Sequence, residues 1–219
     1  MPPARSTLHR LLALAAAHLT GFGAVALYWM GDPTRPALDV AARRWTDAWT
    51  TPLVAEAMEV VTVLGSIPVT LALLLGLALW WMRRDQRRAA WVLTASVAAA
   101  ELTLTALKFG FGRMRPAAPG LLLPDASFPS GHAFHAAFAY GLLALALGRR
   151  LQHRGLRAAL GTLALSIVLL VGSSRLALDV HYATDVLGGL LLGGAWLAAT
   201  GAALLRYADL PVSSATRSR

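Results

Sequence analysis

"LLALAAAHLTGFGAVALYWM", residues 11–30, carries no formally charged side chain over twenty positions. About twenty apolar residues form a helix long enough to cross the hydrocarbon core of a bilayer. Five further apolar runs follow, at 58–82, 89–107, 132–148, 157–173 and 186–205. None alternates as a barrel strand does, and only helices and closed barrels satisfy their backbone in lipid. The sequence therefore predicts an all-α polytopic membrane protein, with six transmembrane helices in one bundle.

The composition agrees with this class, since 57% of the 219 residues are hydrophobic and 14% are charged. We expect one membrane domain over residues 1–210 and a disordered cytoplasmic tail over 211–219. The first run could instead be a secretory signal, because Arg5 and Arg10 precede it and "AVA" at 24–26 resembles a cleavage site. Its length and the five later runs favour an uncleaved membrane helix. The absence of cysteine excludes disulfides and thiolate nucleophiles.

The net charge of +9 comes mainly from arginine clusters between the apolar runs. With six spans, thirteen of the twenty basic residues fall on one face, which is then the cytoplasmic face and carries both termini. Topology and anionic lipid headgroups explain such clusters, so no nucleic-acid partner is expected. On the opposite face, residues 38–57 place Trp45 and Trp49 among charges. We expect an interfacial amphipathic helix there, before the second span.

Three polar segments stand at the ends of apolar runs, and the six-span topology puts all of them on the outer face. They are "KFGFGRMRP" (108–116), "PSGH" (129–132) and "SRLALDVHYATD" (174–185). Four cations in these segments depart from the charge asymmetry and need a local explanation: Lys108, Arg113, Arg115 and Arg175. We expect the ends of spans three, four and six to meet around one tetrahedral anion.

The three segments contain the groups that a phosphoryl group requires. Lys108, Arg115 and Arg175 supply positive charge for several oxygens. Ser130 and Gly131 stand where the fourth helix should begin, and the unpaired N–H groups at a helix N-terminus favour an anion. Gly131 also lets the backbone approach that anion closely. The sequence thus predicts a phosphate-binding site.

Two histidines and one carboxylate supply the chemistry. His181 and Asp185 are four residues apart, so on a helix they share one face and the carboxylate can orient the imidazole. An imidazole can itself attack phosphorus, so no serine or cysteine is needed. We expect His132 to be the general acid that protonates the leaving oxygen. Because a helix N-terminus disfavours imidazolium, His132 should become a good acid only when a phosphate dianion is bound.

The pattern K-x6-R-P, P-S-G-H and S-R-x5-H-x3-D resembles the three signatures of the type 2 phosphatidic acid phosphatase superfamily. This family also includes bacterial undecaprenyl pyrophosphate phosphatases and vanadium haloperoxidases. The resemblance implies a phosphatase without metal or cofactor, in which His181 forms a phosphohistidine, Asp185 orients it and His132 protonates the leaving group. It implies that the phosphate is held by Lys108, Arg115, Ser130, Gly131 and Arg175.

Several polar residues lie outside the signatures. Arg113 is expected to be an interfacial anchor or a phosphate neighbour of minor effect. For His135 a packing role is favoured over one in lining the pocket. Glu101 lies within a span, where a structural polar contact is favoured over catalysis. His18 is expected to contact another helix inside the membrane. Close helix packing is expected at Gly188, Gly189, Gly193 and Gly194.

The favoured function is an integral-membrane lipid phosphatase of the cell membrane, with its site on the outer face. Among lipid substrates we favour undecaprenyl pyrophosphate, with phosphatidate and phosphatidylglycerophosphate as alternatives. The partners are then the lipid substrate and the bilayer. A phospholipid transporter or flippase without chemistry is the non-enzymatic alternative, and it would leave His181, His132 and Asp185 without a role. A haloperoxidase is disfavoured by the membrane spans.

Overall fold

The structure is a computed structural model that describes residues 3–32, 36–116 and 126–208. The expected tail at 211–219 lies outside these residues. Within them the regular elements are helical, as predicted. They are α1 (Pro3–Gly31), α2 (Ala37–Trp49), α3 (Pro52–Thr62), the short 3-10 helix η1 (Val63–Gly65), α4 (Ile67–Met82), α5 (Arg87–Phe111), α6 (Gly131–Gly148), α7 (Arg154–Ala177) and α8 (Ala183–Tyr207).

Six helical segments of the described chain are long and apolar enough to cross a membrane, which confirms the predicted number. The second of them runs through α3, η1 and α4, from Pro52 to Met82. It begins at Pro52 because Thr51 caps α3, accepting a hydrogen bond from Val54 N at 3.3 Å, and proline suits the first helical turn. The expected interfacial segment 38–57 was therefore too long: α2 ends at Trp49, and the remainder belongs to this span.

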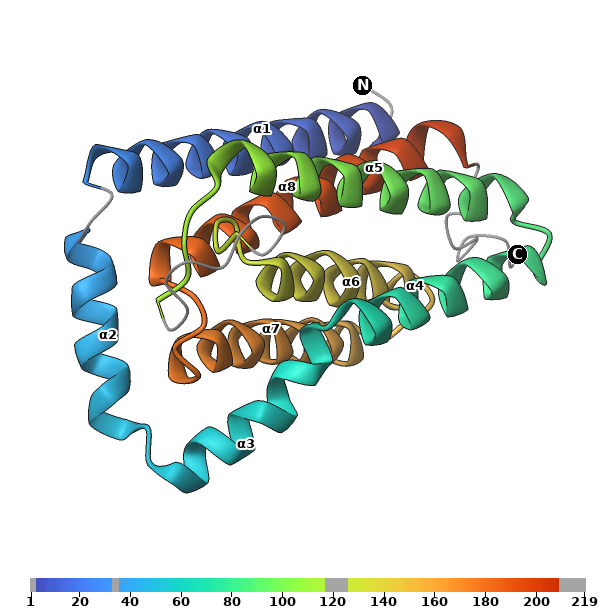
Figure 1. The fold of residues 1–219 in the computed structure, drawn as a ribbon. Helices are drawn as coiled ribbons and strands as arrows, with labels where there is room; N and C mark the ends of the chain where they lie inside the picture. The colour runs from blue at the N-terminus through green and yellow to red at the C-terminus, as the bar shows by residue number, and fades with distance from the viewer. Residues whose placement is uncertain (1–2, 33–35, 117–125, 209–219) are drawn as a thin grey trace.

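Helix α8 is the central element of the bundle. It packs along α1 and α6 and also meets α5, while α6 lies between α7 and α8 (Figure 1). Glycine permits this approach: a Cβ on Gly193 would lie 2.6 Å from the carbonyl oxygen of Phe134, and one on Gly189 only 3.1 Å from Cβ of Ala133. The expected close packing at these glycines is found.

Helix α2 runs across one end of the bundle. One end of each of the helices α1, α5, α6, α7 and α8 lies there as well (Figure 1). It contacts both α7 and α8. The bend in the second span reaches the same end, since a Cβ on Gly65 would lie 2.9 Å from the carbonyl oxygen of His132. Polar segments that are distant in the sequence are thereby brought to one end of the molecule.

An aromatic cluster fixes the chain just before α6. Phe128 is fully buried, and its ring lies 5.5 Å from those of Phe22 and Trp29 and 4.9 Å from that of Phe111. Gly188 of α8 leaves room for it, because a Cβ there would lie 2.6 Å from the Phe128 ring. Helices α1, α5 and α8 thus hold the residues that open α6 in place.

Candidate active site

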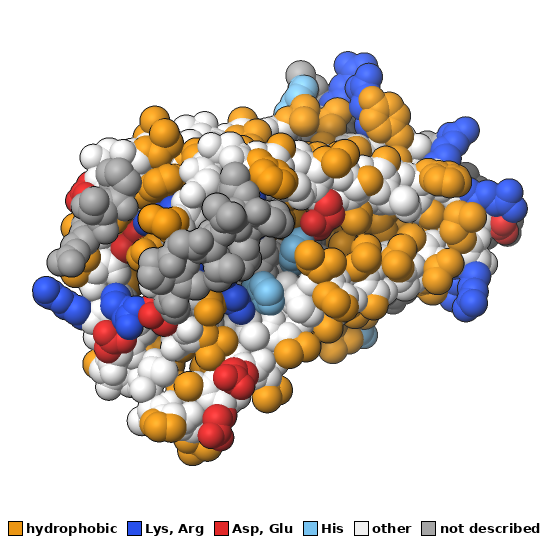
Figure 2. Space-filling model, in the orientation of Figure 1, with side chains coloured by type: hydrophobic (Ala, Val, Ile, Leu, Met, Phe, Trp, Pro, Cys, Tyr) orange, Lys and Arg blue, Asp and Glu red, His pale blue; other side chains and the backbone are white. Residues whose placement is uncertain are grey.

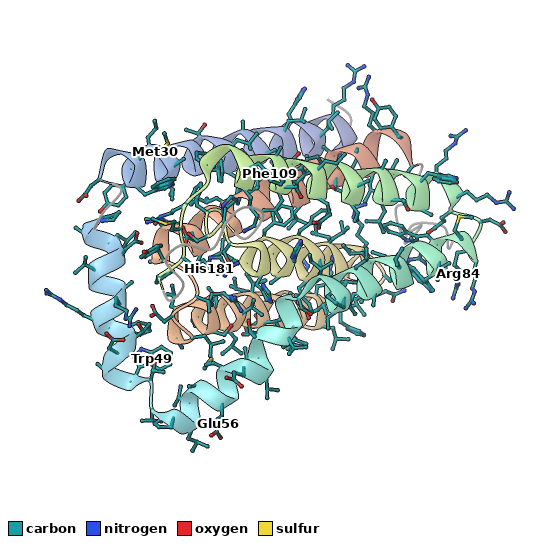
Figure 3. The ribbon with its side chains drawn as sticks, viewed as in Figure 1. Met30, Trp49, Glu56, Arg84, Phe109 and His181 are labelled. Carbon is teal, nitrogen blue, oxygen red and sulfur yellow. The ribbon has the colours of Figure 1, made fainter. Side chains whose placement is uncertain are left out.

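Four helix ends form the site: the end of α5, the start of α6, the end of α7 and the start of α8. A cavity of about 270 Å³ opens beside α5 and the start of α6, and residues from all three polar segments line it, including His181 from the turn between α7 and α8. Five of the predicted residues line it: Lys108, Arg115, Gly131, His132 and His181. The predicted convergence is therefore found. Figure 3 places His181 within the bundle end, far from Arg84 at the opposite end, and Figure 2 shows histidine side chains reaching the surface between hydrophobic areas.

His181 lies in the turn between α7 and α8 and is almost fully buried. Its Nδ1 is 3.4 Å from Oδ2 of Asp185, and its Nε2 is 3.3 Å from Nη1 of Arg115. A guanidinium can only donate, so Nε2 faces it as an acceptor and the ring proton belongs on Nδ1, toward the carboxylate. Burial, together with the charges of Arg115 and Arg175, lowers the pKa of His181 to about 4 against the opposing effect of Asp185. The imidazole is thus neutral at pH 7, with its lone pair at the cavity.

Asp185 is fully buried, and both of its carboxylate oxygens accept hydrogen bonds. Its Oδ2 accepts a hydrogen bond from the backbone N–H of Tyr182 at 2.8 Å, and its Oδ1 accepts one from Arg113 at 2.6 Å. The carbonyl oxygen of Asp185 also accepts the N–H of Ser130 at 2.9 Å, which ties the start of α6 to the start of α8. The carboxylate is therefore fixed in position beside His181.

Arg113 differs from its sequence-based expectation, because it is neither an interfacial anchor nor a minor phosphate neighbour. It is buried, and its guanidinium bridges Asp185 and Asp39, with Nη2 at 2.7 Å from Oδ2 of Asp39. It lies over the rings of Trp29 and Tyr182, at 4.6 and 4.2 Å from their centroids. Arg113 thus connects α1, α2 and α8 behind the cavity.

Asp39 of α2 is the residue of this network that the sequence did not single out. Its Oδ1 accepts the backbone N–H of Thr184 at 2.8 Å, and its Oδ2 accepts the Thr184 hydroxyl at 2.9 Å. A carboxylate at the first turn of α8 also suits the helix dipole. The one available signal was Arg113 itself, a cation on the face where positive charge is rare.

The start of α6 presents an open N-terminus to the cavity. A Cβ on Gly131 would be in ordinary van der Waals contact with the side chains of His135, Leu104 and Lys108, at 3.8 to 3.9 Å, and Gly131 itself lines the cavity. Ser130 is fully buried, and its hydroxyl has no hydrogen-bond partner among the described residues. Lys108, from the end of α5, reaches the same place and donates to the carbonyl oxygen of Ala126. An anion placed here would meet N–H groups, a hydroxyl and an ammonium group.

Arg175 lies at the edge of this arrangement. It is buried at the end of α7 and donates a hydrogen bond to the Thr62 hydroxyl at 2.6 Å, rather than lining the cavity. It nevertheless lies within electrostatic range of His181. Among the described residues, no group of three histidine, aspartate or glutamate side chains is arranged to hold a metal ion.

Two further expectations outside the signatures agree with the structure. Glu101 makes a polar contact inside the bundle, with Oε1 at 2.9 Å from Nε2 of the buried His135. Nδ1 of His18 in α1 donates to the carbonyl oxygen of Leu14 at 2.7 Å, and the ring packs against Gly194 of α8.

Comparison with known proteins gives consistent matches. The sequence model of the PAP2 superfamily matches residues 89–206, more than half of the 219 residues. Phosphatidylglycerophosphatase B of Bacillus subtilis (strain 168) is 41% identical over 92 residues, which is 40% of this chain and 44% of that protein. The chain thus matches less than half the length of this relative in sequence. The crystal structure of a transmembrane PAP2 type phosphatidylglycerolphosphate phosphatase from Bacillus subtilis has a TM-score of 0.75 and 27% identity, over 86% of this chain and 94% of that one.

Proposed function

Because the chain belongs to the PAP2 superfamily, we propose that it is a membrane-embedded lipid phosphatase that removes a terminal phosphate from a lipid. The observation that carries this proposal is the neutral His181, oriented by Asp185 and open to a cavity that Lys108, Arg115 and the start of α6 surround. We call Lys108, Arg115 and the start of α6 the anion cradle. A nucleophile, this cradle and a second histidine in one cavity are the groups that phosphoryl transfer requires.

The reaction proceeds in two steps. Nε2 of His181 attacks phosphorus, the bond to the lipid oxygen breaks, and His132 gives its proton to that oxygen. A water molecule then loses a proton to His132 and attacks phosphorus, so that phosphate leaves and His181 is regenerated. Asp185 stabilises the imidazole as it becomes positively charged.

Positive charge and N–H groups hold the phosphoryl group through both steps. Lys108 and Arg115 neutralise its oxygens directly, and Arg175 adds charge from behind. Ser130 and Gly131 offer the hydroxyl and the free N–H groups of the first turn of α6. In this proposal no metal ion is required.

The sequence match and the structural match are both named for activity on phosphatidylglycerophosphate, which favours this lipid as the substrate. Undecaprenyl pyrophosphate remains the prediction from sequence, and phosphatidate is a further candidate. All three present a terminal phosphate on a long apolar anchor, and the anion cradle recognises only the phosphate. Discrimination has to come from residues that touch the rest of the lipid.

The site lies on the outer face of the cell membrane in this proposal. Arginine pairs stand at the opposite end of the bundle, where α4 leads to α5 and α6 leads to α7 (Figure 2). The positive-inside rule then favours a cytoplasmic location for that end and for both termini. A lipid could keep its chains in the bilayer while its headgroup enters the cavity.

The test is phosphate release from a panel of purified lipids in detergent. Wild type should release phosphate from at least one of the three candidates, and His181→Ala should release none above background. A chelator should leave the activity unchanged. Activity that survives His181→Ala would support the transporter alternative, and chelator-sensitive activity would contradict the proposed mechanism.

A further inference from the structure

A second histidine–carboxylate pair lies inside the spanning part of the bundle. Glu101 of α5 and His135 of α6 approach to 2.9 Å, and the side chain of His135 is only 6% exposed while that of Glu101 is 39% exposed. Ionisable groups within a span are costly, and where they occur they generally mark a ligand or a pathway. The mechanism above uses neither residue.

The pair shares its cavity with the reacting groups. Glu101 and His135 line the same 270 Å³ space as His132 and His181. A Cβ built on Gly131 would lie 3.8 Å from Cε1 of His135, so this imidazole stands directly beside the anion-binding start of α6. His135 also follows His132 by three residues on α6, which places it on the same helix face and nearly one turn deeper in the bundle.

The surroundings of the pair are mostly apolar. Apolar side chains that line the cavity beside the pair include Ile67, Leu104 and Phe109. A smaller adjoining hollow of about 70 Å³, which Glu101 and His135 also line, is otherwise formed by Ile67, Thr70, Leu71, Leu74, Val97 and Phe138. The pair therefore stands where the anion cradle gives way to apolar walls. In a lipid phosphate, the atoms that join the terminal phosphate to the apolar chains would lie at this boundary.

The part of the substrate that reaches the pair is the leaving group. If His132 protonates the leaving oxygen, the next atoms of the leaving group lie near His135 and Glu101, which line the same cavity. A carboxylate accepts a hydrogen bond from a hydroxyl, and a pyrophosphate leaving group has no hydroxyl to donate. Oε1 of Glu101 lies 2.9 Å from Nε2 of His135, and the second oxygen of the carboxylate can accept from the substrate.

Resting on the proposed lipid phosphatase function, we propose that Glu101, positioned by His135, binds a hydroxyl group in the leaving group. This subsite selects lipids with a hydroxylated, glycerol-type leaving group over pyrophosphates and over lipids that lack the hydroxyl. It distinguishes lipids by their leaving groups, which the anion cradle does not contact.

The experiment compares two substrates that differ by one hydroxyl: phosphatidylglycerophosphate and an analogue with propane-1,3-diol in place of the terminal glycerol. The full chain in detergent should hydrolyse the natural lipid with a kcat/KM at least about tenfold higher, as one hydrogen bond to a charged group would give. Glu101→Leu should abolish this preference by lowering kcat/KM for the hydroxylated lipid alone, and Glu101→Gln should reduce it.

Glu56→Leu is the matched control, because it removes an exposed carboxylate from α3, away from the cavity (Figure 3). It should leave both rates unchanged. Equal losses on both substrates in the two Glu101 variants would overturn the proposal and make the pair a structural contact. A wild type that does not distinguish the substrates would also overturn it. A wild type that hydrolyses no lipid phosphate would instead overturn the proposed function itself.

Discussion

At the scale of single residues, the environment of His181 sets the pH range of the site. Its pKa of about 4 lies well below the ordinary value near 6.5, because burial and two arginines disfavour the imidazolium. The nucleophile is thus neutral above pH 4 and is protonated, and inactive, below it. We expect the acid limb of the kcat/KM profile to fall near pH 4 to 5 rather than near 6.5.

Arg115→Gln tests the cause of that shift. It removes a cation 3.3 Å from the ring, so the acid limb should move upward in pH while the maximal rate falls. An unmoved limb would contradict the assignment of this limb to His181.

Arg113 gives a second prediction at this scale. Lysine keeps the charge but cannot bridge Asp39 and Asp185 or stack between two rings, so Arg113→Lys breaks a buried network. We expect a loss of stability of about 1 to 3 kcal/mol from the lost hydrogen bonds, seen as a lower Tm. The rate should fall about 10- to 100-fold in kcat with little change in KM, on the scale of losing a supporting contact. Asp39→Asn should show the same pattern more weakly. A change in KM alone would indicate that Arg113 binds the phosphate instead.

The sequence identified the signature residues that face the cavity, and Asp185 behind His181, but not the contacts that hold Asp185 in place. His132, His181 and Lys108 belong to short patterns whose spacing has a chemical meaning. Asp39 and Arg113 are 74 positions apart and share no local pattern, so only tertiary structure joins them. The distribution of basic residues along the sequence could indicate that Arg113 lies on the membrane face where such residues are rare. It could not indicate which residues Arg113 pairs with.

At the scale of elements, the contact between α6 and α8 decides whether the site forms. Gly193→Val would place a Cβ 2.6 Å from the carbonyl oxygen of Phe134 and push the helices apart. Overpacking of this kind costs about 1 to 3 kcal/mol or more, and a backbone contact cannot be relieved by a rotamer change. We expect a lower Tm and reduced activity together, measured in detergent.

Gly161→Val is the matched control, since a Cβ there would meet nothing within 4 Å. Its Tm should stay within the range of ordinary surface substitutions. If both variants were equally unstable, the loss would come from helix propensity or lipid contact rather than from the α6–α8 packing.

The elements themselves were largely predictable, because long apolar runs leave few alternatives in lipid. Five of the six spans agree in position with the runs that the sequence displays. The exception is the second, where Thr51 and Pro52 start a helix within a stretch that amphipathic patterning assigned to the interface. The cap at Thr51 and the proline that follows it start a new helix, although the charge pattern of residues 38–57 suggested one interfacial segment.

At the scale of the whole molecule, the orientation in the membrane is testable with single cysteines, because the natural chain has none. Arg44→Cys, on the exposed side of α2, should react with a membrane-impermeant thiol reagent in intact cells. Arg84→Cys, at the opposite end, should react only after the membrane is permeabilised (Figure 3). The reverse pattern would put the site in the cytoplasm and contradict the proposed localisation.

The packing of α1 against α8 has a consequence for folding during synthesis. Helix α1 leaves the ribosome before α8, so its packing on α8 and the bond between Asp39 and Thr184 form only after α8 is made. A chain interrupted before α8 cannot assemble the network around Asp185. The arrangement of the site is thereby coupled to the membrane insertion of α8.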